Sequence, residues 1–492
     1  MSKTCEDLFL GIDCSIIGNR DEEVSGIAYR SDKVCPGDAF FCIVGLTADG
    51  HTFAQDAIDR GAKVIVVERK MYLVDASEVT EVVVKDTRKA MALCAANFYG
   101  HPSASLGLVG VTGTNGKTTT TYLVEHIARS AGKRTGIIGT VGVRIGDARE
   151  KAVHTTPESP DLQHLLDRMR DARCDVVAME VSSHALDLER TWGTRFAVSA
   201  FSNLTQDHLD YHKTFEAYFE AKARLFSQEY PAKRVIRIDD PWGRELLRRC
   251  SNAQDAIITT GFDASALIHP LDVEYGQTDT TLTLDVRGTS YRFAYPLVGR
   301  FNVDNIMCAF GVGLHLGIPP STIVDALKDA PPIPGRLERV KASADGGIAV
   351  YVDYAHTPDA LEKAIASVKE VTSGSTIVVF GCGGNRDTSK RSIMGRAALN
   401  ADYAVVTSDN PRHEDPLAII DDILPGMRSD PDRFEIEPDR RGAIARAIAL
   451  AKPGDSVLVA GKGHEDYQLV KDAVLPFDDV VVAGEELRKA FG

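Results

Sequence analysis

A glycine-rich turn at Gly113–Gly116 constrains this chain more than any other feature. The apolar run Leu106–Val111 predicts a buried strand, and Tyr122–Ser130 predicts a helix. Lys117 and Thr118 stand between the turn and that helix. A strand, a glycine turn and a helix start, in this order, form a cradle for phosphate groups, because glycine lets backbone amides approach a phosphate closely.

The turn has the short form GTNGKTT and departs from the general P-loop pattern, which requires glycine where the chain has Val111. We expect Lys117 to lie between the β- and γ-phosphates and the Thr118 hydroxyl to ligate Mg²⁺. The alternative is a glycine-rich turn with a solvated lysine. The pattern predicts a nucleoside triphosphate but no particular reaction. The residues expected to bind ATP are Gly113, Thr114, Asn115, Gly116, Lys117, Thr118 and Thr119.

Length and patterning predict an α/β chain of three domains. The 492 residues correspond to about three domains by the usual length rule. Residues 1–101 are expected to form a small α/β unit that binds part of a substrate or is purely structural. Residues 102–335 predict a central P-loop-type domain with a mostly parallel sheet, and residues 336–492 a Rossmann-like domain. Glycine and proline at 99–102 and 331–334 mark the boundaries.

Charge and cysteine content exclude several classes of partner. A net charge of −14 argues against nucleic acid and anionic membranes, although a local basic pocket can still bind an anionic small molecule. The nine cysteines include no CxxC pair, which predicts free thiols in a reducing cytoplasm. We find no export signal and no apolar run near the ~20 residues that cross a bilayer. We therefore expect a cytoplasmic protein, without membrane insertion, that acts as a monomer.

Polar side chains follow the predicted strands of the central domain. The strand Asp175–Val181 carries Glu180 near its carboxyl end, where ligands gather in open α/β sheets. We expect Glu180 to reach the same cation as Thr118, the alternative being a carboxylate that ends a strand by chance. The oxygen-rich setting favours Mg²⁺ over zinc. Histidines and aspartates follow in two loops: His184, Asp207, His208, Asp210 and His212.

Two later segments of the central domain are ambiguous. Aromatic residues recur at helical spacing in 215–228, which predicts a helix that carries Lys222. Spacing alone makes Lys222 a solvated or ion-paired lysine. Residues 301–316 predict another helix, with Asn302 either as its N-cap or in contact with an adenine.

The last domain presents polar loops from three predicted strands. The apolar segments Thr376–Phe380, Ala404–Thr407 and Ser456–Ala460 each end in a polar, glycine-containing or proline-containing loop. The carboxyl ends of parallel strands meet at one edge of a sheet, so we expect a second ligand crevice there. Ordinary turn chemistry is the alternative for any single loop.

Ten motifs occur along the chain in one order: GTNGKTT, EVSSHAL, NLTQDHLDYH, AKARLF, FNVDN, PGRLE, DYAHTP, FGCGGNRD, DNPR and GKGHED. Over essentially its whole length the chain thereby resembles the Mur ligase family of peptidoglycan synthesis. DNPR with GKGHE is the most specific part and is similar to the branch that adds meso-2,6-diaminopimelate to UDP-N-acetylmuramoyl-L-alanyl-D-glutamate. The resemblance implies an ATP- and Mg²⁺-dependent amide ligase that works through an acyl phosphate.

The resemblance also implies roles for individual residues. Those expected at the catalytic centre are Lys117, Glu180, His208, Lys222, Arg336, Asp353 and His356. The implied metal ligands are Thr118, Glu180, His208 and Lys222, with Lys222 carbamylated, and the implied adenine neighbours are Asn302 and Asn305. The UDP-substrate residues are Ser31, Gly45, Thr155, Thr156, Ser182 and Arg190. The diaminopimelate residues are Arg391, Asp409, Asn410, Pro411, Arg412, Gly461 and Glu465.

The chain departs from the family pattern at two positions. Arg30-Ser31-Asp32 stands where the family usually has Asp-Ser-Arg or Asp-Ser-Lys, and Leu188 stands where some members have glutamine. Details of UDP-substrate binding are therefore expected to differ.

The preference for diaminopimelate follows from the residues as well. Diaminopimelate carries a distal carboxylate that lysine lacks, and the Arg412 guanidinium can hold that group with two parallel hydrogen bonds. Without it a buried Arg412 would stay unpaired, which disfavours lysine. Two other ligases remain open, a lysine-adding homologue and a folate-polyglutamate-type ligase. A nucleotide-switched binding protein is the alternative from another class.

Overall fold

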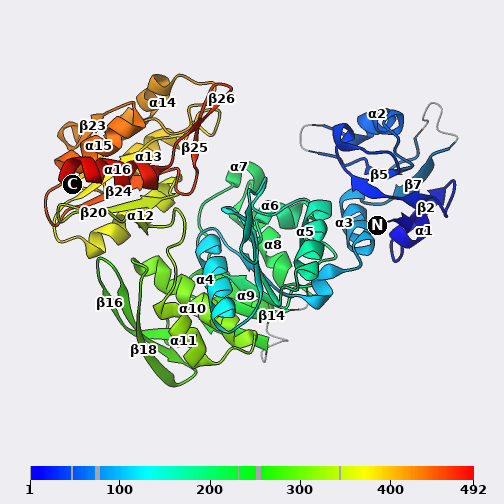
Figure 1. Ribbon diagram of the computed structural model, residues 1–492, viewed down its shortest axis with the longest axis horizontal. Helices are drawn as coiled ribbons and strands as arrows, with labels where there is room; N and C mark the ends of the chain where they lie inside the picture. Colours follow the sequence, from blue (N-terminus) through cyan, green and yellow to red (C-terminus); the bar gives the residue numbers. More distant parts are fainter. Residues whose placement is uncertain (1, 46–47, 72–77, 231, 251–255, 343–344) are drawn as a thin grey trace.

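The computed structural model describes residues 2–45, 48–71, 78–230, 232–250, 256–342 and 345–492. Its larger sheets lie in three successive parts of the chain, at residues 14–84, 107–295 and 338–460. Figure 1 shows the N-terminal and C-terminal units at opposite ends of the long axis, with the central unit between and below them. Within the described ranges, no helix has the length and apolar character needed to cross a membrane.

The N-terminal unit is a five-stranded sheet in the order β2-β7-β6-β5-β4. Asp86 caps α3 by accepting hydrogen bonds from the backbone amides of Arg88 and Lys89. The elements are β1 (Lys3–Thr4), α1 (Cys5–Leu8), β2 (Cys14–Ile17), β3 (Glu23–Val24), β4 (Gly26–Ala28), β5 (Asp38–Phe41), α2 (Ala54–Asp59), β6 (Val64–Val67), β7 (Thr80–Val84) and α3 (Thr87–Phe98).

The central unit is built on an eleven-stranded sheet in the order β11-β10-β9-β12-β8-β13-β14-β15-β16-β17-β18. Its middle is parallel and both ends are antiparallel hairpins. The strands are β8 (Gly107–Thr112), β9 (Thr135–Gly139), β10 (Gly142–Ile145), β11 (Ala148–Glu150), β12 (Val176–Glu180), β13 (Val198–Phe201), β14 (Lys233–Arg237), β15 (Ile257–Thr260), β16 (Ile268–Tyr275), β17 (Thr280–Val286) and β18 (Thr289–Tyr295).

Helices cover both faces of this sheet and bury two separate cores. On one face lie α4 (Lys117–Ser130), α10 (Arg300–His315) and α11 (Pro320–Lys328). On the other lie α5 (Ser159–Asp171), α6 (Ser183–Asp187), α8 (Phe215–Ala223) and α9 (Pro241–Arg249), and the short α7 (Leu209–His212) ends the loop after β13. The central strands are apolar because both faces are covered.

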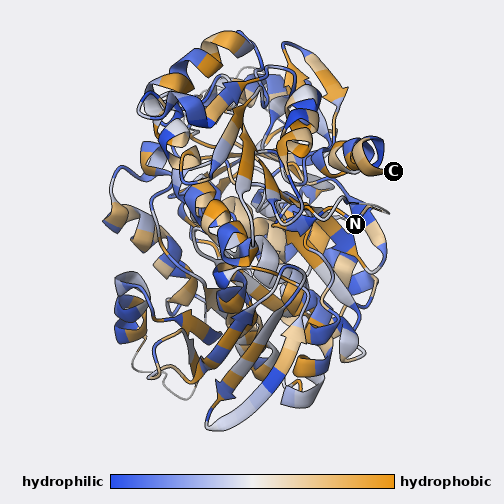
Figure 2. Ribbon diagram, turned by 90° about the vertical axis from the view of Figure 1, so that its left-hand side faces the viewer, coloured by the Kyte–Doolittle hydropathy of each residue, from blue (hydrophilic) through white to orange (hydrophobic). Residues whose placement is uncertain are grey.

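The C-terminal unit repeats this plan on a smaller scale. Its sheet has the order β19-β20-β24-β21-β22-β23 and is parallel except for β19. Figure 2 shows hydrophobic strands inside this unit, between helices of mixed character. The elements are β19 (Glu338–Arg339), β20 (Ala349–Asp353), α12 (Pro358–Val371), β21 (Thr376–Phe380), α13 (Arg391–Ala398), β22 (Tyr403–Val406), α14 (Pro416–Ile423), β23 (Phe434–Ile436), α15 (Arg440–Leu450), β24 (Ser456–Ala460), β25 (Tyr467–Val470), β26 (Ala473–Pro476) and α16 (Asp479–Phe491).

Two expectations about helices were wrong. The helix predicted for 215–228 ends at Ala223 and is followed by a single 3₁₀ turn. Its apolar residues pack against β12 and β13 and do not form one continuous apolar face along a longer helix. Asn302 is not an N-cap: Gly299 precedes α10, and Asn302 lies inside the first turn of that helix.

Candidate functional site

The phosphate cradle lies between β8 and α4, as the motif predicts. Gly116, with φ of 87°, directly precedes α4. A Cβ atom on Gly113 would lie 1.9 Å from the Ser202 hydroxyl oxygen, and one on Gly116 would lie 2.2 Å from Asn305 Oδ1. Both positions therefore exclude any side chain. Open glycine backbone next to a helix N-terminus is the arrangement that receives phosphate oxygens.

Lys117 is held inside this cradle. Its Nζ donates hydrogen bonds to the carbonyl oxygens of Gly113 and Thr114, at 2.9 Å each. Burial lowers the pKa of Lys117, and the Glu180 carboxylate opposes that shift. The solvated lysine that served as the alternative is thus wrong. A partly desolvated ammonium held by carbonyl oxygens is ready to exchange these oxygens for those of a phosphate.

Thr118 and Glu180 face each other, as expected from their places after β8 and at the end of β12. The Thr118 hydroxyl donates to Glu180 Oε2 at 3.0 Å, and the Thr140 amide donates to Glu180 Oε1 at 2.8 Å. Arg336, from the interdomain segment, donates to the Thr118 hydroxyl at 3.1 Å. A carboxylate beside a hydroxyl is an oxygen donor set that fits Mg²⁺.

The protein alone does not complete a metal cage at this point. Among the described residues, no group of three histidine, cysteine, aspartate or glutamate side chains is placed to hold a metal ion. A magnesium ion at Thr118 and Glu180 would take its remaining ligands from nucleotide oxygens and water, which is how Mg²⁺ is usually bound at phosphate sites.

Lys222 is buried rather than solvated, so the interpretation from spacing alone was wrong. Its side chain is 1% exposed, and its Nζ donates to the Gly113 carbonyl at 2.8 Å. The ammonium lies 4.5 Å from the centroid of the Tyr218 ring, and within the described chain no carboxylate forms an ion pair with it. Burial, with a contribution from Lys117, holds the pKa of Lys222 well below its ordinary value.

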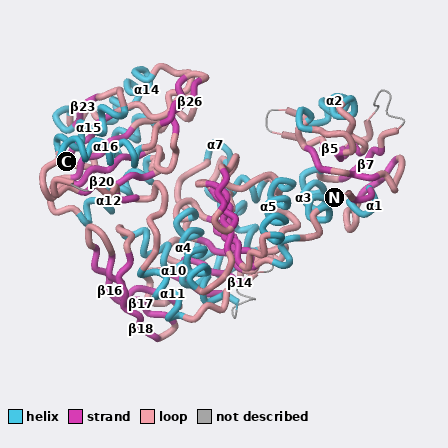
Figure 3. Tube along the Cα trace, viewed as in Figure 1, coloured by secondary structure: helices cyan, strands magenta, loops and turns pink. Residues whose placement is uncertain are grey.

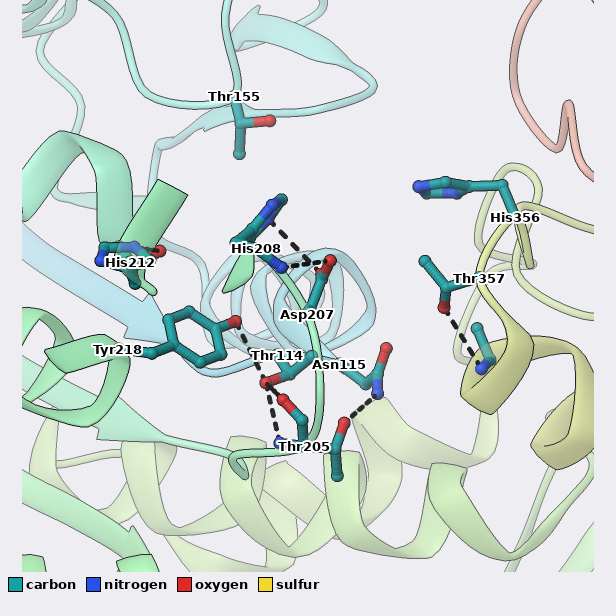
Figure 4. A network of polar contacts seen from close by, with 12 residues as sticks. Thr114, Asn115, Thr155, Thr205, Asp207, His208, His212, Tyr218, His356 and Thr357 are labelled. Carbon is teal, nitrogen blue, oxygen red and sulfur yellow. Dashed lines mark hydrogen bonds and ion pairs between the residues drawn. The ribbon is translucent and has the colours of Figure 1, made fainter. Parts of the chain in front are cut away.

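His184, His208 and His212 gather beside the cradle, and Figure 4 labels the last two. The rings of His184 and His208 have their centroids 4.7 Å apart, and His212 shares a 2.9 Å hydrogen bond with the Ser183 hydroxyl. Burial lowers the pKa of His208 to about 4, although Asp207 acts in the opposite direction. The ring is therefore neutral near pH 7 and has a lone pair available for a cation or a proton.

The C-terminal unit contacts the cradle directly. Asp359 Oδ2 accepts hydrogen bonds from Asn115 at 3.3 Å and from the Thr205 hydroxyl at 3.1 Å. Figure 4 shows the His356 ring across an open space from His208. Sequence reasoning missed Asp359, although its place directly after the motif DYAHTP was the available signal.

Asp353 has an indirect position. Its carboxylate accepts hydrogen bonds from the backbone amides of Leu337 at 2.7 Å and Ala355 at 2.8 Å. Burial raises its pKa. It thus fixes the loop that carries Arg336, which reaches the cradle.

Asn302 and Asn305 lie inside α10, next to the cradle. Asn302 donates to the Val298 carbonyl at 2.8 Å, and Asn305 donates to Asn302 Oδ1 at 3.1 Å. Thr120 of α4 donates to Asn305 Oδ1 at 3.4 Å. The pair connects α10 to the helix that follows the phosphate turn; the contact with adenine stays a prediction.

The residues expected to hold the UDP-substrate form two connected groups. Ser31 and Gly45 line a cavity of about 340 Å³ in the N-terminal unit, and Glu158 of the central unit completes its wall. Arg190 forms a 2.8 Å ion pair with Glu158 and donates to the Thr156 carbonyl. Further hydrogen bonds connect this group to Glu180. The Thr156 hydroxyl donates to the Glu180 carbonyl and to the Ser182 hydroxyl, and the hydroxyls of Thr155 and Thr140 share a hydrogen bond.

The departure at Arg30-Ser31-Asp32 has a local consequence. Arg30 and Asp32 form an exposed ion pair with each other at 2.9 Å, on the rim of this same cavity. The two side chains thus satisfy each other across Ser31. Leu188 ends the helix α6 as its C-cap.

The loops after β22 and β24 meet, as the parallel arrangement requires. Asn410 donates to Glu465 Oε2 at 2.8 Å, and Lys462 donates to Asn410 Oδ1 at 3.3 Å. A Cβ atom on Gly461 would lie 2.5 Å from the Asp409 carboxylate, so the close approach of the loops needs glycine there. Burial raises the pKa of Glu465. Lys462, which is completely buried, was missed from the sequence.

The two arginines predicted to bind a carboxylate differ in what they already contact. Arg391 is buried and pairs with Glu414 and Asp422, at 2.9 Å each. Arg412 is half-buried, has a left-handed backbone with φ of 53°, and donates to the Gly384 carbonyl at 2.8 Å. No carboxylate of the described residues pairs with Arg412. Of these two arginines, only Arg412 therefore has a guanidinium that is available to pair with a ligand carboxylate. Pro411 precedes it in the same loop.

A buried ion pair supports both of these loops from behind. Arg440 and Asp479 are each fully buried and joined by two hydrogen bonds, at 2.8 and 2.7 Å. The same guanidinium donates to the carbonyls of Ala460 at 3.0 Å and Ser408 at 3.4 Å. One side chain thus ties together the ends of β22 and β24.

Replacing Arg440 with methionine is expected to lower the free energy of unfolding by about 3–5 kcal/mol, because Asp479 is left buried and unpaired. The double variant R440M/D479L should recover most of that loss. Urea unfolding measures both. The control is Arg441→Met, which removes a partly exposed arginine that pairs with Glu485 and Glu486; because Glu486 keeps its ion pair with Lys489, the change should cost less than about 1 kcal/mol. Equal losses for R440M and the double variant would contradict this account.

Comparison with known proteins was made at the level of families, sequences and structures. The Mur ligase middle domain matches residues 111–313, the Mur ligase glutamate ligase domain matches 335–463, and the Mur ligase family catalytic domain matches 23–99. A UDP-N-acetylmuramoyl-L-alanyl-D-glutamate–2,6-diaminopimelate ligase of Syntrophomonas wolfei is 45% identical over 96% of both chains. The ligase of that name from Aquifex aeolicus is 43% identical over 97% of this chain and 96% of its own.

Solved structures give the same grouping. A structure of UDP-N-acetylmuramoyl-L-alanyl-D-glutamate–2,6-diaminopimelate ligase superimposes with a TM-score of 0.72 at 32% identity, covering 100% of this chain and 99% of the other. A folylpolyglutamate synthase of Mycobacterium tuberculosis complexed with ADP has a TM-score of 0.62 at 20% identity, over 82% of this chain and 94% of its own. At that identity the second likeness shows the fold alone.

Proposed function

The chain belongs to the Mur ligase family, and we propose that it joins meso-2,6-diaminopimelate to UDP-N-acetylmuramoyl-L-alanyl-D-glutamate at the expense of ATP, in peptidoglycan synthesis. The relatives that carry this name match it over almost their full length. The observation that carries the choice of acceptor is Arg412, whose guanidinium has no carboxylate partner among the described residues while the neighbouring Arg391 has two.

We assign one substrate to each unit: the UDP-sugar peptide to residues 1–101, ATP to 102–335 and diaminopimelate to 336–492. The cavity at Ser31 and Gly45 supports the first assignment. The cradle at Gly113–Lys117 supports the second, and the loops around Arg412 support the third. The chain of contacts from Glu158 through Arg190 and Thr156 to Glu180 connects the first site to the second.

In the proposed reaction the γ-carboxylate of the D-glutamyl unit attacks the γ-phosphorus of ATP, and the bond to ADP breaks. The amine at the L-centre of diaminopimelate then attacks the acyl carbon, loses a proton and expels phosphate. Lys117 neutralises charge on the transferring phosphoryl group. Arg336, 3.1 Å from the Thr118 hydroxyl, is placed to contact the same region. Most of the catalytic effect in such a reaction comes from positioning.

Mg²⁺ is the metal that we propose for this site. Thr118 and Glu180 would hold it, and the neutral His208 ring is available for a second ion. When bound, Mg²⁺ neutralises phosphate charge and orients the γ-phosphoryl group.

We propose that Lys222 is carbamylated. Carbamate formation needs an uncharged amine, which forms a bond to the carbon of CO₂ and releases one proton. Burial holds the pKa of Lys222 well below its ordinary value, which increases the fraction of uncharged amine at any given pH. The product replaces a buried cation beside Lys117 with an anionic oxygen ligand suited to Mg²⁺.

The decisive experiment supplies ATP and the UDP-dipeptide and varies the amino acid. We expect ADP and the UDP-tripeptide to form with meso-diaminopimelate. A strong preference for L-lysine would establish the lysine-adding alternative, and transfer of glutamate to a folate would establish the folate-polyglutamate alternative. Hydrolysis of ATP at the full rate without any acceptor would favour the nucleotide-switched binding protein and overturn the proposal.

Replacing Arg412 with lysine is expected to raise the KM for diaminopimelate roughly tenfold or more and to reduce discrimination against lysine, because an ammonium cannot imitate the two-pronged guanidinium contact. Steady-state kinetics with both amino acids measure the change. The control is Arg446→Lys, an exposed arginine paired with Glu435 on the surface of α15. An unchanged KM for diaminopimelate would remove Arg412 from the acceptor site.

We further propose that the protein acts as a cytoplasmic monomer. All nine cysteines are free, which suits a reducing compartment. The contacts of Asp359 and Arg336 with the cradle come from the same chain, so no second copy is needed to bring the ATP and acceptor units together.

A further inference from the structure

A second cavity lies at the edge of the central sheet opposite the cradle. It has a volume of about 590 Å³. Four of its lining residues directly precede parallel strands, while the cradle follows the carboxyl end of β8; the lining residues are Leu106, Ala197, Ala232 and Ala256. Strands of this length separate the two edges by roughly 20 Å. Figure 3 shows β14 below α7 in the central unit, and α7 follows the cradle-side loop of β13.

The charge of this cavity is opposite to that of the whole chain. Arg195, Lys233 and Arg234 line it, and no aspartate or glutamate is among the described residues that do so. The chain as a whole carries 70 acidic and 56 basic residues. Lys233 is exposed and donates to the His315 carbonyl, and no carboxylate among the described residues forms an ion pair with it. Among the described lining residues, three are basic and none is acidic, so the local charge favours the binding of an anion.

Arg234 is the unusual member of this group, and it also lines a neighbouring cavity together with Glu220 and Cys250. It is only 8% exposed, and its Nε is buried without a hydrogen-bond partner. In the part of the chain that the structure describes, no carboxylate forms an ion pair with it. Arg237, three residues further along β14, pairs with Asp239 at 2.8 Å and with Asp304 at 3.1 Å. Buried guanidinium groups normally have such partners, because an unpaired buried charge is costly.

We propose that this cavity binds a small phosphorylated anion, at a site separate from the ligase reaction. The Arg234 guanidinium would hold two phosphoryl oxygens in parallel, and Lys233 and Arg195 would neutralise the remaining charge at the rim. Leu106 and Phe196 supply an apolar wall for an uncharged part of the ligand. The alternative is an arginine whose alkyl stem is buried while its head reaches bulk water.

The test uses inorganic pyrophosphate as the probe and calorimetry on the full chain. A Lys117→Ala background weakens binding at the cradle, so that the second site is measured alone. We expect one equivalent of pyrophosphate to bind, with an affinity that falls as salt is raised. Arg234→Gln in this background should weaken binding by about tenfold or more. Arg292→Gln, an exposed arginine of β18, is the matched control and should change nothing.

Inorganic phosphate, AMP and citrate are parallel arms that define the ligand class. Binding of AMP with pyrophosphate, but not citrate, supports a phosphoryl-specific site; binding of citrate alone contradicts it. A second variant, Ala197→Glu, leaves Arg234 in place and puts a carboxylate at the exposed rim, where it should compete with the anion. No binding to the Lys117→Ala protein, or equal binding in all variants, overturns the proposal. None of these measurements requires turnover, so they are independent of the proposed ligase activity.

Discussion

Lys117→Ala is expected to lower kcat by roughly 10³-fold or more while the protein remains folded, because it removes the cation that faces the transferred phosphoryl group. Lys117 already lies in the cradle, bonded to the Gly113 and Thr114 carbonyls, so its charge needs little reorganisation when ATP binds. The release of ADP in the presence of both other substrates measures the loss.

The fold should tolerate this change. Burial lowers the pKa of Lys117, so the folded state disfavours its charged form, and removing the ammonium relieves that penalty. We expect the thermal midpoint to move by no more than about 3 °C. Lys133→Ala, an exposed lysine just past the end of α4, is the matched control for activity and stability. A variant that retains activity within about tenfold of the wild type would remove Lys117 from the chemistry.

Lys222→Ala is expected to lose activity by roughly 10²-fold or more, because it removes the group that we propose to become an anionic metal ligand. A small carboxylate such as acetate should restore part of the rate by occupying the space left beside Gly113 and Tyr218. Steady-state rates with increasing acetate, at constant ionic strength, measure the rescue.

The matched control is acetate added to Lys117→Ala, where no carboxylate ligand is missing and no rescue is expected. Incubation with ¹³C-bicarbonate gives an independent measurement, a carbamate signal that is present in the wild type and absent in Lys222→Ala. Because burial lowers the pKa of Lys222, we expect this signal to persist to a lower pH than for an ordinary lysine with a pKa of 10.5. If acetate does not restore the activity of Lys222→Ala and the wild type shows no carbamate signal, the proposed modification is wrong.

The sequence by itself determined the local elements of the site. The alternation of apolar segments with glycine-rich and polar loops predicted β8, β12, β21 and β24 almost to the residue, because strand periodicity and glycine turns are local properties. The same order of elements placed Thr118 opposite Glu180, since neighbouring parallel strands end at one edge. The family resemblance was available at this level too.

Only the tertiary structure decided which side chains are paired and which are free. Lys222 is hydrogen-bonded to Gly113, 109 residues away in the sequence, and Arg336 to Thr118, 218 residues away. No local pattern could therefore show that Lys222 is buried or that Arg336 connects two units. The sequence does not distinguish Arg391 from Arg412 as a ligand for a carboxylate, yet in the structure only Arg391 of the two forms ion pairs with acidic side chains. Charge pairing and desolvation depend on the whole surrounding shell, which forms only when distant segments pack together.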